Sequence, residues 1–277
     1  MKRRDFIKVL AFGAGASSLP VTQSVLAAAS SSGSQFEVVK DSIMKSRDFD
    51  RHFSDDIVLR GVAYKRLTSV VARLKRLQRL VGYANFSLIS FDQALYYARN
   101  YSKVGEFPKA EIEFLEAIFY TNASNYGFFG EKPLNKITDH LVKRDLIKIR
   151  GTGHYVFRSD SLTLYKKIRK DVGSSIILTS GVRGIVKQMH LFLNKAIASK
   201  GNLSMASRSL APPGHSFHGV GDFDVGKHGY GSRNFSEDFA KTDEFKRLSD
   251  LGYVDIRYPP ENKLGVRFEP WHIKVIV

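Results

Sequence analysis

The strongest constraint on the fold of this chain is a change in hydrophobic periodicity near residue 173. From about residue 37 to 172, apolar residues mostly recur at helical spacing. In residues 66–80, one helix face carries the apolar side chains Val70, Val71, Leu74 and Leu77. After residue 173, short apolar runs typical of strands alternate with helical stretches. The pattern predicts an α+β fold, with a mainly helical region at 37–172 followed by a mixed region at 173–277.

Individual elements carry their own signals. Ser90 and Gln93 form a capping-box pattern at the start of a predicted helix, and Pro108 stands where the first turn of another helix tolerates proline. In the mixed region we expect a buried strand at 175–179 and a helix that ends at Gly201. A single helix over EDFAKTDEFKRLSDLG and strands in YVDIRYP, GVRFEP and HIKVIV complete the prediction.

Residues 134–158, LNKITDHLVKRDLIKIRGTGHYVFR, allow a second interpretation. They read as a helix, a strand, a Gly-Thr-Gly turn and a second strand, which is also the order in a winged-helix DNA-binding domain. The formal net charge of +16 indicates an anionic partner, either nucleic acid, a membrane surface or an acidic polymer. An export signal argues against nucleic acid, which we do not expect as a partner.

That signal lies at the start of the chain. The charged segment MKRRDFIK is followed by a mildly apolar stretch ending in Ala27, Ala28 and Ala29, as in a secretory signal peptide. Arg3 and Arg4 resemble the twin-arginine export signal. We therefore expect a signal peptide at 1–29, a Ser- and Gly-rich linker at 30–36, and a periplasmic protein. This stretch contains too many polar residues for a membrane-spanning helix. We therefore expect no stable membrane span after cleavage.

The chain contains no cysteine, which limits its chemistry. Disulfides, thiolate zinc sites and cysteine nucleophiles are excluded together. A metal ion would have to be held by His, Asp or Glu side chains.

Two segments supply such side chains. PPGHSFHGVGDFDVG at 212–226 contributes His218 and Asp224, and RFEPWHIKV contributes His272. Two imidazoles and a carboxylate suit zinc and leave a fourth position for water, which zinc activates as a nucleophile. Glu269, three residues before His272, is placed to act as general base and then general acid.

Two points of local geometry stay open. Asp222 and Asp224 lie on the same face of a strand, so either could reach a metal ion, and we favour Asp224. Glu269 and His272 would point to opposite faces of an ideal strand, so that a bend or bulge at Pro270 is needed to bring them together. We expect the other histidines to be surface or core residues: His52, His140, His154, His190, His215 and His228.

These motifs resemble those of the VanY-type zinc D-alanyl-D-alanine carboxypeptidases, which trim the peptide stems of bacterial peptidoglycan. In the family pattern Ser-x-His-x-x-Gly-x-Ala-x-Asp, three positions are matched by Ser216, His218 and Gly221. The aspartate comes six residues after the histidine instead of seven, and Asp222 stands where alanine is expected. The pattern Glu-x-Trp-His is matched in full by Glu269, Trp271 and His272, and Ser-Gly-Tyr-Arg…Gln is matched by Ser180, Gly181, Arg183 and Gln188, with Val182 replacing tyrosine.

The resemblance covers roughly residues 174–277 and implies a role for each matched residue. Zn²⁺ would be the cofactor, held by His218, Asp224 and His272, and peptidoglycan stem peptides would be the substrate. Arg183 would pair with the carboxylate of the terminal D-alanine, while Gln188 and Ser216 would orient that residue.

Three alternatives remain at this point. They are an L,D-carboxypeptidase, an endopeptidase that cuts peptidoglycan crosslinks, and a non-catalytic module that binds wall polymer or nucleic acid. The sequence does not specify an oligomeric state.

Overall fold

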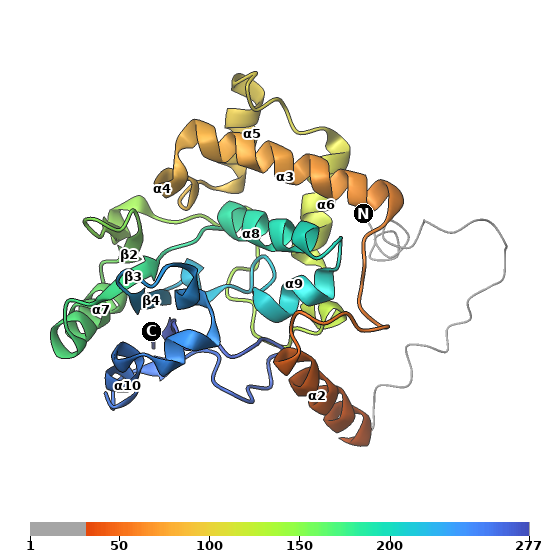
Figure 1. The fold of residues 1–277 in the computed structure, drawn as a ribbon. Helices are drawn as coiled ribbons and strands as arrows, with labels where there is room; N and C mark the ends of the chain where they lie inside the picture. The colour runs from red at the N-terminus through yellow and green to blue at the C-terminus, as the bar shows by residue number, and fades with distance from the viewer. Residues whose placement is uncertain (1–31, 277) are drawn as a thin grey trace.

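The computed structural model describes residues 32–276 (Figure 1). The signal peptide expected at 1–29 lies outside these residues. Helix α2 (Ser32–Arg47) begins inside the segment 30–36, where we expected a linker. Ser and Gly have low helix propensity, but extending a formed helix costs much less than nucleating one. Among the described residues, no helix has both the length and the apolar character needed to cross a bilayer.

The region after α2 is helical, as predicted. It contains α3 (Gly61–Val81), α4 (Tyr83–Phe86), α5 (Phe91–Asn100) and α6 (Lys109–Tyr120). The four apolar residues predicted to share one face of α3 are all buried. Ser90 and Gln93 form the predicted capping box at the start of α5, and Pro108 is the N-cap of α6. Local signals therefore mark the starts of α5 and α6.

A β-hairpin follows this helical region, formed by β1 (Leu146–Lys148) and β2 (Tyr155–Phe157). The helix predicted before it is absent, since residues 134–142 contain no helix and only a 3₁₀ turn (η3, Lys143–Asp145) precedes β1. The side chain of Asp139 accepts a hydrogen bond from the backbone N–H of Lys136 at 2.9 Å, which favours a turn over a helix. The winged-helix interpretation therefore lacks its helix.

A four-stranded antiparallel sheet forms the second half of the molecule. Its strand order is β3 (Ile176–Ser180), β4 (Phe223–Lys227), β6 (His272–Lys274), β5 (Asp255–Ile256). Helices α7 (Asp160–Val172) and α10 (Asp243–Ser249) share a hydrophobic cluster with the sheet. The mixed helix and sheet content agrees with the predicted α+β class.

The remaining elements are η2 (Ala123–Tyr126), α8 (Ile185–Ala198), α9 (Leu203–Ser209), η4 (Phe217–Gly219), η5 (Gly231–Phe235) and η6 (Glu237–Lys241).

Two predictions in this half are wrong. The single helix expected over residues 237–252 is divided into η6 and α10, because the Thr242 side chain caps the start of α10 by accepting from Phe245 N at 3.2 Å. The segment GVRFEP forms no strand. Its backbone instead bonds to segments distant in sequence, with Arg267 N–H donating to Arg208 O in α9 and Glu269 N–H donating to Tyr258 O.

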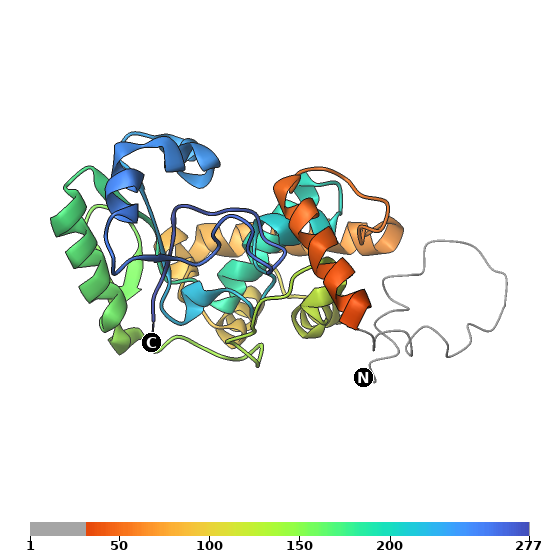
Figure 2. The same ribbon diagram turned by 90° about the horizontal axis from the view of Figure 1, so that it is seen from below.

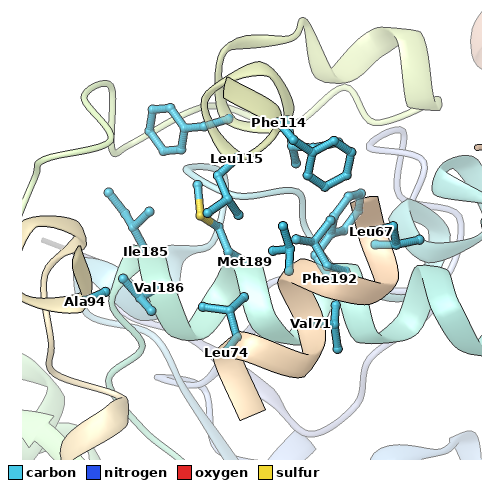
Figure 3. Packing of buried hydrophobic residues seen from close by; sticks show 14 of the residues in the cluster. Leu67, Val71, Leu74, Ala94, Phe114, Leu115, Ile185, Val186, Met189 and Phe192 are labelled. Atoms are coloured by element: carbon cyan, nitrogen blue, oxygen red, sulfur yellow. The ribbon is translucent and has the colours of Figure 1, made fainter. Parts of the chain in front are cut away.

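The largest hydrophobic cluster crosses the boundary expected at residue 173. Helix α8 runs along α3 (Figures 1 and 2), and its apolar face contacts the helical region. Figure 3 shows Met189 and Phe192 of α8 among Leu67, Leu74 and Phe114. The helical region and the sheet region thus share one core through α8.

Candidate active site

Antiparallel pairing of β4 and β6 places Asp224 directly opposite His272. His218 lies in η4, just before β4, and its ring is 4.7 Å from the ring of His272 between centroids. Donor atoms of these three buried residues all lie within 4.8 Å of one another. Two segments that are far apart in the sequence therefore meet in one potential ligand set.

Hydrogen bonding leaves suitable lone pairs in this set. The Nδ1 atom of His218 lies 2.8 Å from the carbonyl oxygen of Gly181, which can only accept, so the hydrogen belongs on Nδ1. The lone pair of Nε2 then points toward Asp224, whose Oδ1 is 3.1 Å away. This oxygen is buried and has no hydrogen-bond donor among the described residues. A buried orphan acceptor facing two imidazoles fits a divalent cation.

Asp222 lies behind the set and contacts the other side of the His272 ring. Its Oδ2 atom is 3.0 Å from Nε2 of His272, and its carboxylate accepts two bonds from Arg257 at 2.7 and 2.9 Å. The backbone N–H of Val275 donates a further bond at 2.9 Å. A carboxylate at Nε2 favours the hydrogen on that nitrogen and leaves Nδ1 facing Asp224 and Glu269. The geometry therefore groups Asp224, and not Asp222, with the two histidines.

Glu269 reaches the set through a turn. Residues 270 and 271 form the turn that precedes β6, and the backbone N–H of His272 donates to Glu269 O at 3.1 Å. The Oε2 atom of Glu269 is then 3.2 Å from Nδ1 of His272. A bend thus occurs at Pro270, where we expected one.

Arg183, Gln188 and Ser216 lie around the same centre. The guanidinium of Arg183 donates to Asp224 Oδ2 at 3.0 Å and also contacts Nε2 of His218. A second nitrogen of Arg183 donates to Gln188 Oε1 at 3.4 Å, and the Gln188 amide donates to Ala211 O at 2.5 Å. Ser216 lines the adjoining cavity. Arg183 and a cation would therefore compete for the same imidazole lone pair.

The protein environment shifts the protonation of the three donors. Burial, reinforced by the Arg183 charge, lowers the pKa of His218 to about 4. Burial raises the pKa of Asp224, but the charges of His218 and Arg183 outweigh it and lower that pKa to about 2. Burial lowers the pKa of His272, but hydrogen bonds to Asp222 and Glu269 raise it to about 9. At neutral pH, Asp224 is ready to bind a cation, whereas His272 would exchange a proton for it.

A cavity of about 380 Å³ opens beside these residues. Its wall includes Tyr258, whose ring lies 5.1 Å from His272, and Trp271. Neither Tyr258 nor Arg257 belongs to a motif that stands out in the sequence. The sequence contains 12 tyrosines and many arginines, and no local pattern marks these two as site residues. They reach the site through the pairing of β5 with β6, which the sequence does not reveal.

His215 lies near the set in sequence but outside it in space. Its Nδ1 atom is 2.9 Å from Glu131 O, and its ring packs on Phe128 at 5.1 Å between centroids. Tyr126 and Phe128 are themselves buried. These contacts indicate a structural role for this histidine.

Residues 158–276 match the family model described as VanY, D-alanyl-D-alanine carboxypeptidase. This part of the chain is a VanY domain. The match includes α7, which precedes the boundary expected at residue 173. The residues of the candidate site all lie inside the VanY domain.

Two solved structures resemble part of the chain. One is the vancomycin resistance D,D-dipeptidase VanXYg in complex with a D-Ala-D-Ala phosphinate analogue, at 25% identity and a TM-score of 0.40, covering 47% of this chain and 55% of that chain. The other is VanYB in complex with D-alanine-D-alanine, at 24% identity and a TM-score of 0.37, covering 48% of this chain and 77% of that chain. The match therefore spans about half the length of the first structure, 55%. No curated protein matches the chain.

Proposed function

We propose that this protein is a zinc-dependent D-alanyl-D-alanine carboxypeptidase that trims peptidoglycan stem peptides. One observation carries the proposal: within a VanY domain, the buried donor atoms of His218, Asp224 and His272 converge within 4.8 Å, with Glu269 beside them. The residue types and their convergence fit a zinc site with an open position.

The three donors would hold the ion. Zinc bound there would supply an activated water and polarise the scissile carbonyl group. Gly181 O fixes the orientation of the His218 ring, and Asp222 fixes that of His272. Fixed rings present their lone pairs without a further loss of conformational freedom.

Glu269 would move the proton. This residue lies in the cavity wall and is only 7% exposed, and its Oε2 atom is 3.2 Å from His272 Nδ1. From this position it can take a proton from the attacking water and return it to the amine of the leaving D-alanine. The contact with His272 restricts this carboxylate, and a positioned carboxylate transfers a proton more readily than a freely rotating one.

Arg183 would bind the C-terminal carboxylate of the substrate. Its contact with Gln188 and the bond from Gln188 to Ala211 O restrict the guanidinium, and its Nε atom is buried without a partner among the described residues. Gln188 would thus act on the substrate through Arg183. The Ser216 hydroxyl lines the cavity and would orient the terminal residue.

The test uses the purified full chain and a stem pentapeptide. We expect release of D-alanine that stops on chelation and returns with zinc. A Glu269→Gln variant should keep one zinc per chain but lose at least about a hundredfold in kcat, the usual contribution of a general base. Full activity in that variant, or activity indifferent to chelation, would contradict the proposal.

The same assay separates the alternatives. Release from a tetrapeptide instead would indicate an L,D-carboxypeptidase, and cleavage of a substrate with no free C-terminus would indicate an endopeptidase. Replacing Arg183 should reduce carboxypeptidase activity far more than endopeptidase activity. Periplasmic location by the twin-arginine route is a further proposal, supported by residues 1–29, and export should fail when Arg3 and Arg4 are both replaced by lysine.

A further inference from the structure

One side of the cavity is formed by a single face of α8. Lys187, Leu191 and Lys195 recur every four residues, and all three line the cavity. Arg183 lies just before this helix, and Arg267 lines the same cavity from the C-terminal segment. The wall therefore carries four basic side chains, although the proposed catalysis uses only Arg183.

The three additional basic groups have no acidic partner at close range. Arg183 forms an ion pair with Asp224. Within residues 32–276, no ion pair is formed by Lys187, Lys195 or Arg267. Arg267 donates one bond to Phe235 O at 3.0 Å, and its Nε atom is buried without a partner. The charges of Glu269, Glu237 and Asp50 reach Arg267 only from a distance. Partly buried cations without counter-charges favour an anionic ligand.

The basic groups form two ends of the cavity. Burial lowers the pKa of both Lys187 and Lys195. The charge of Arg183 lowers the pKa of Lys187 further, and the charge of Arg267 does the same for Lys195. Leu191 stands between the lysines on the helix face. The two lysines are eight residues apart, which corresponds to a helical rise of about 12 Å. An extended peptide covers that distance with roughly three to four residues.

We propose that the cavity selects acidic peptides that carry a second carboxylate roughly three residues before the free C-terminus. The C-terminal carboxylate binds at Arg183 and Lys187, and the second carboxylate binds at Lys195 and Arg267. Leu191 faces the small apolar residues between them. This inference rests on the proposed function, which places the C-terminus of the substrate at Arg183. It adds a second recognised group on the peptide, away from the cleaved bond.

Two pentapeptides test the inference. They share a D-Ala-D-Ala terminus and differ only at the second residue, where one has a carboxylate and the other its amide. Binding is measured with the full-length Glu269→Gln chain loaded with zinc, which separates recognition from turnover. We expect about tenfold tighter binding of the acidic peptide, the size of one charge-assisted hydrogen bond, and a preference that weakens as salt is raised.

Variants assign the preference to the far end of the cavity. Lys195→Gln should reduce the ratio of the two dissociation constants toward one, and Lys195→Arg should restore it. Lys166→Gln, which changes an exposed lysine of α7 outside the cavity, should leave the ratio unchanged. Thermal unfolding of each variant shows whether the fold is retained.

Equal affinity for the two peptides would overturn the inference, as would a preference that survives Lys195→Gln in a folded protein. Either result leaves the proposed function standing, because D-alanine release by the wild-type chain is measured separately. Conversely, failure to release D-alanine from both peptides, with the binding preference present, would remove the proposed function and support the acidic-peptide site.

Discussion

The two histidines of the candidate site turn opposite ring nitrogens toward Asp224. Gly181 O accepts from His218 Nδ1, whereas Asp222 contacts His272 Nε2, so that Nε2 of one ring and Nδ1 of the other face Asp224. The sequence supplied both histidines and a choice of two aspartates. It could not show which aspartate belongs to the ligand set, because alternation along a strand places both side chains on one face. The two differ in position only because of the turn before β4.

The Asp222→Asn variant tests the orientation of His272. An amide keeps the shape but removes the charge that favours hydrogen on Nε2, so we expect zinc affinity to fall by roughly 10- to 100-fold, as for other partners of metal-bound histidines. Competition with a chromophoric chelator measures this change. Asp145→Asn, at a half-exposed carboxylate far along the chain, is the control. Unchanged zinc affinity in a folded Asp222→Asn protein would remove the orienting role.

At the scale of elements, local patterns predicted several helices correctly and failed where contacts with distant segments determine the structure. The helical pattern of α3, the capping box of α5 and the apolar stripe of α8 are sequence-local features, and the structure contains all three. Residues 134–142 and GVRFEP are instead held by bonds to segments distant in sequence, for example Leu134 N–H to Gly214 O. No single-sequence pattern reports such partners.

Gly181 illustrates a contact that only the fold reveals. A Cβ atom at this position would lie 1.9 Å from the carbonyl oxygen of Tyr155 in β2, where the hairpin crosses the end of β3. We expect Gly181→Ala to destabilise the protein by about 1–3 kcal/mol and to reduce activity, since Gly181 O also orients His218. Urea unfolding measures the first effect. Gly252→Ala, with no atom within 4 Å of its Cβ, should behave as wild type.

At the scale of the molecule, the VanY domain shares its core with the helical region that precedes it. The residues of α8 that contact that region include Ile185, Met189, Phe192 and Leu193. A fragment of residues 158–277 would expose this face to water. We expect the fragment to be aggregated or loosely packed, with hydrophobic-dye binding and no cooperative unfolding, whereas the chain from residue 32 folds. A cooperative, dye-negative fragment would contradict this account.

A buried ion pair ties the segment after α2 to α9. Arg208 donates to Asp56 at 2.7 and 3.1 Å, and both side chains are almost fully buried. Burial raises the pKa of Asp56, but the bonds from Arg208 and from Phe53 N–H outweigh it, and the pKa is lowered. A lowered pKa stabilises the fold above the ordinary aspartate value and loses that contribution as pH falls below it.

Asp56→Asn should therefore cost about 3–5 kcal/mol at pH 7, because it leaves Arg208 buried without its counter-charge. The difference from wild type should shrink as pH falls below about 4, because Asp56 of the unfolded wild-type chain then takes up a proton more readily than the folded carboxylate does. Thermal unfolding between pH 7 and 3 measures both. Asp55→Asn changes an exposed neighbour paired with Lys45 at 2.6 Å and should cost under about 1 kcal/mol at either pH. Equal losses in the two variants would contradict the assignment.

The claim on which the proposed function most depends is that one zinc ion is shared by residues from β4, its preceding turn and β6. Anomalous diffraction at the zinc edge, from crystals of the full chain grown with zinc, locates the ion directly. We predict a single strong peak in contact with His218 Nε2, Asp224 Oδ1 and His272 Nδ1. A fully active protein whose crystals show no zinc peak at these three atoms would contradict the account.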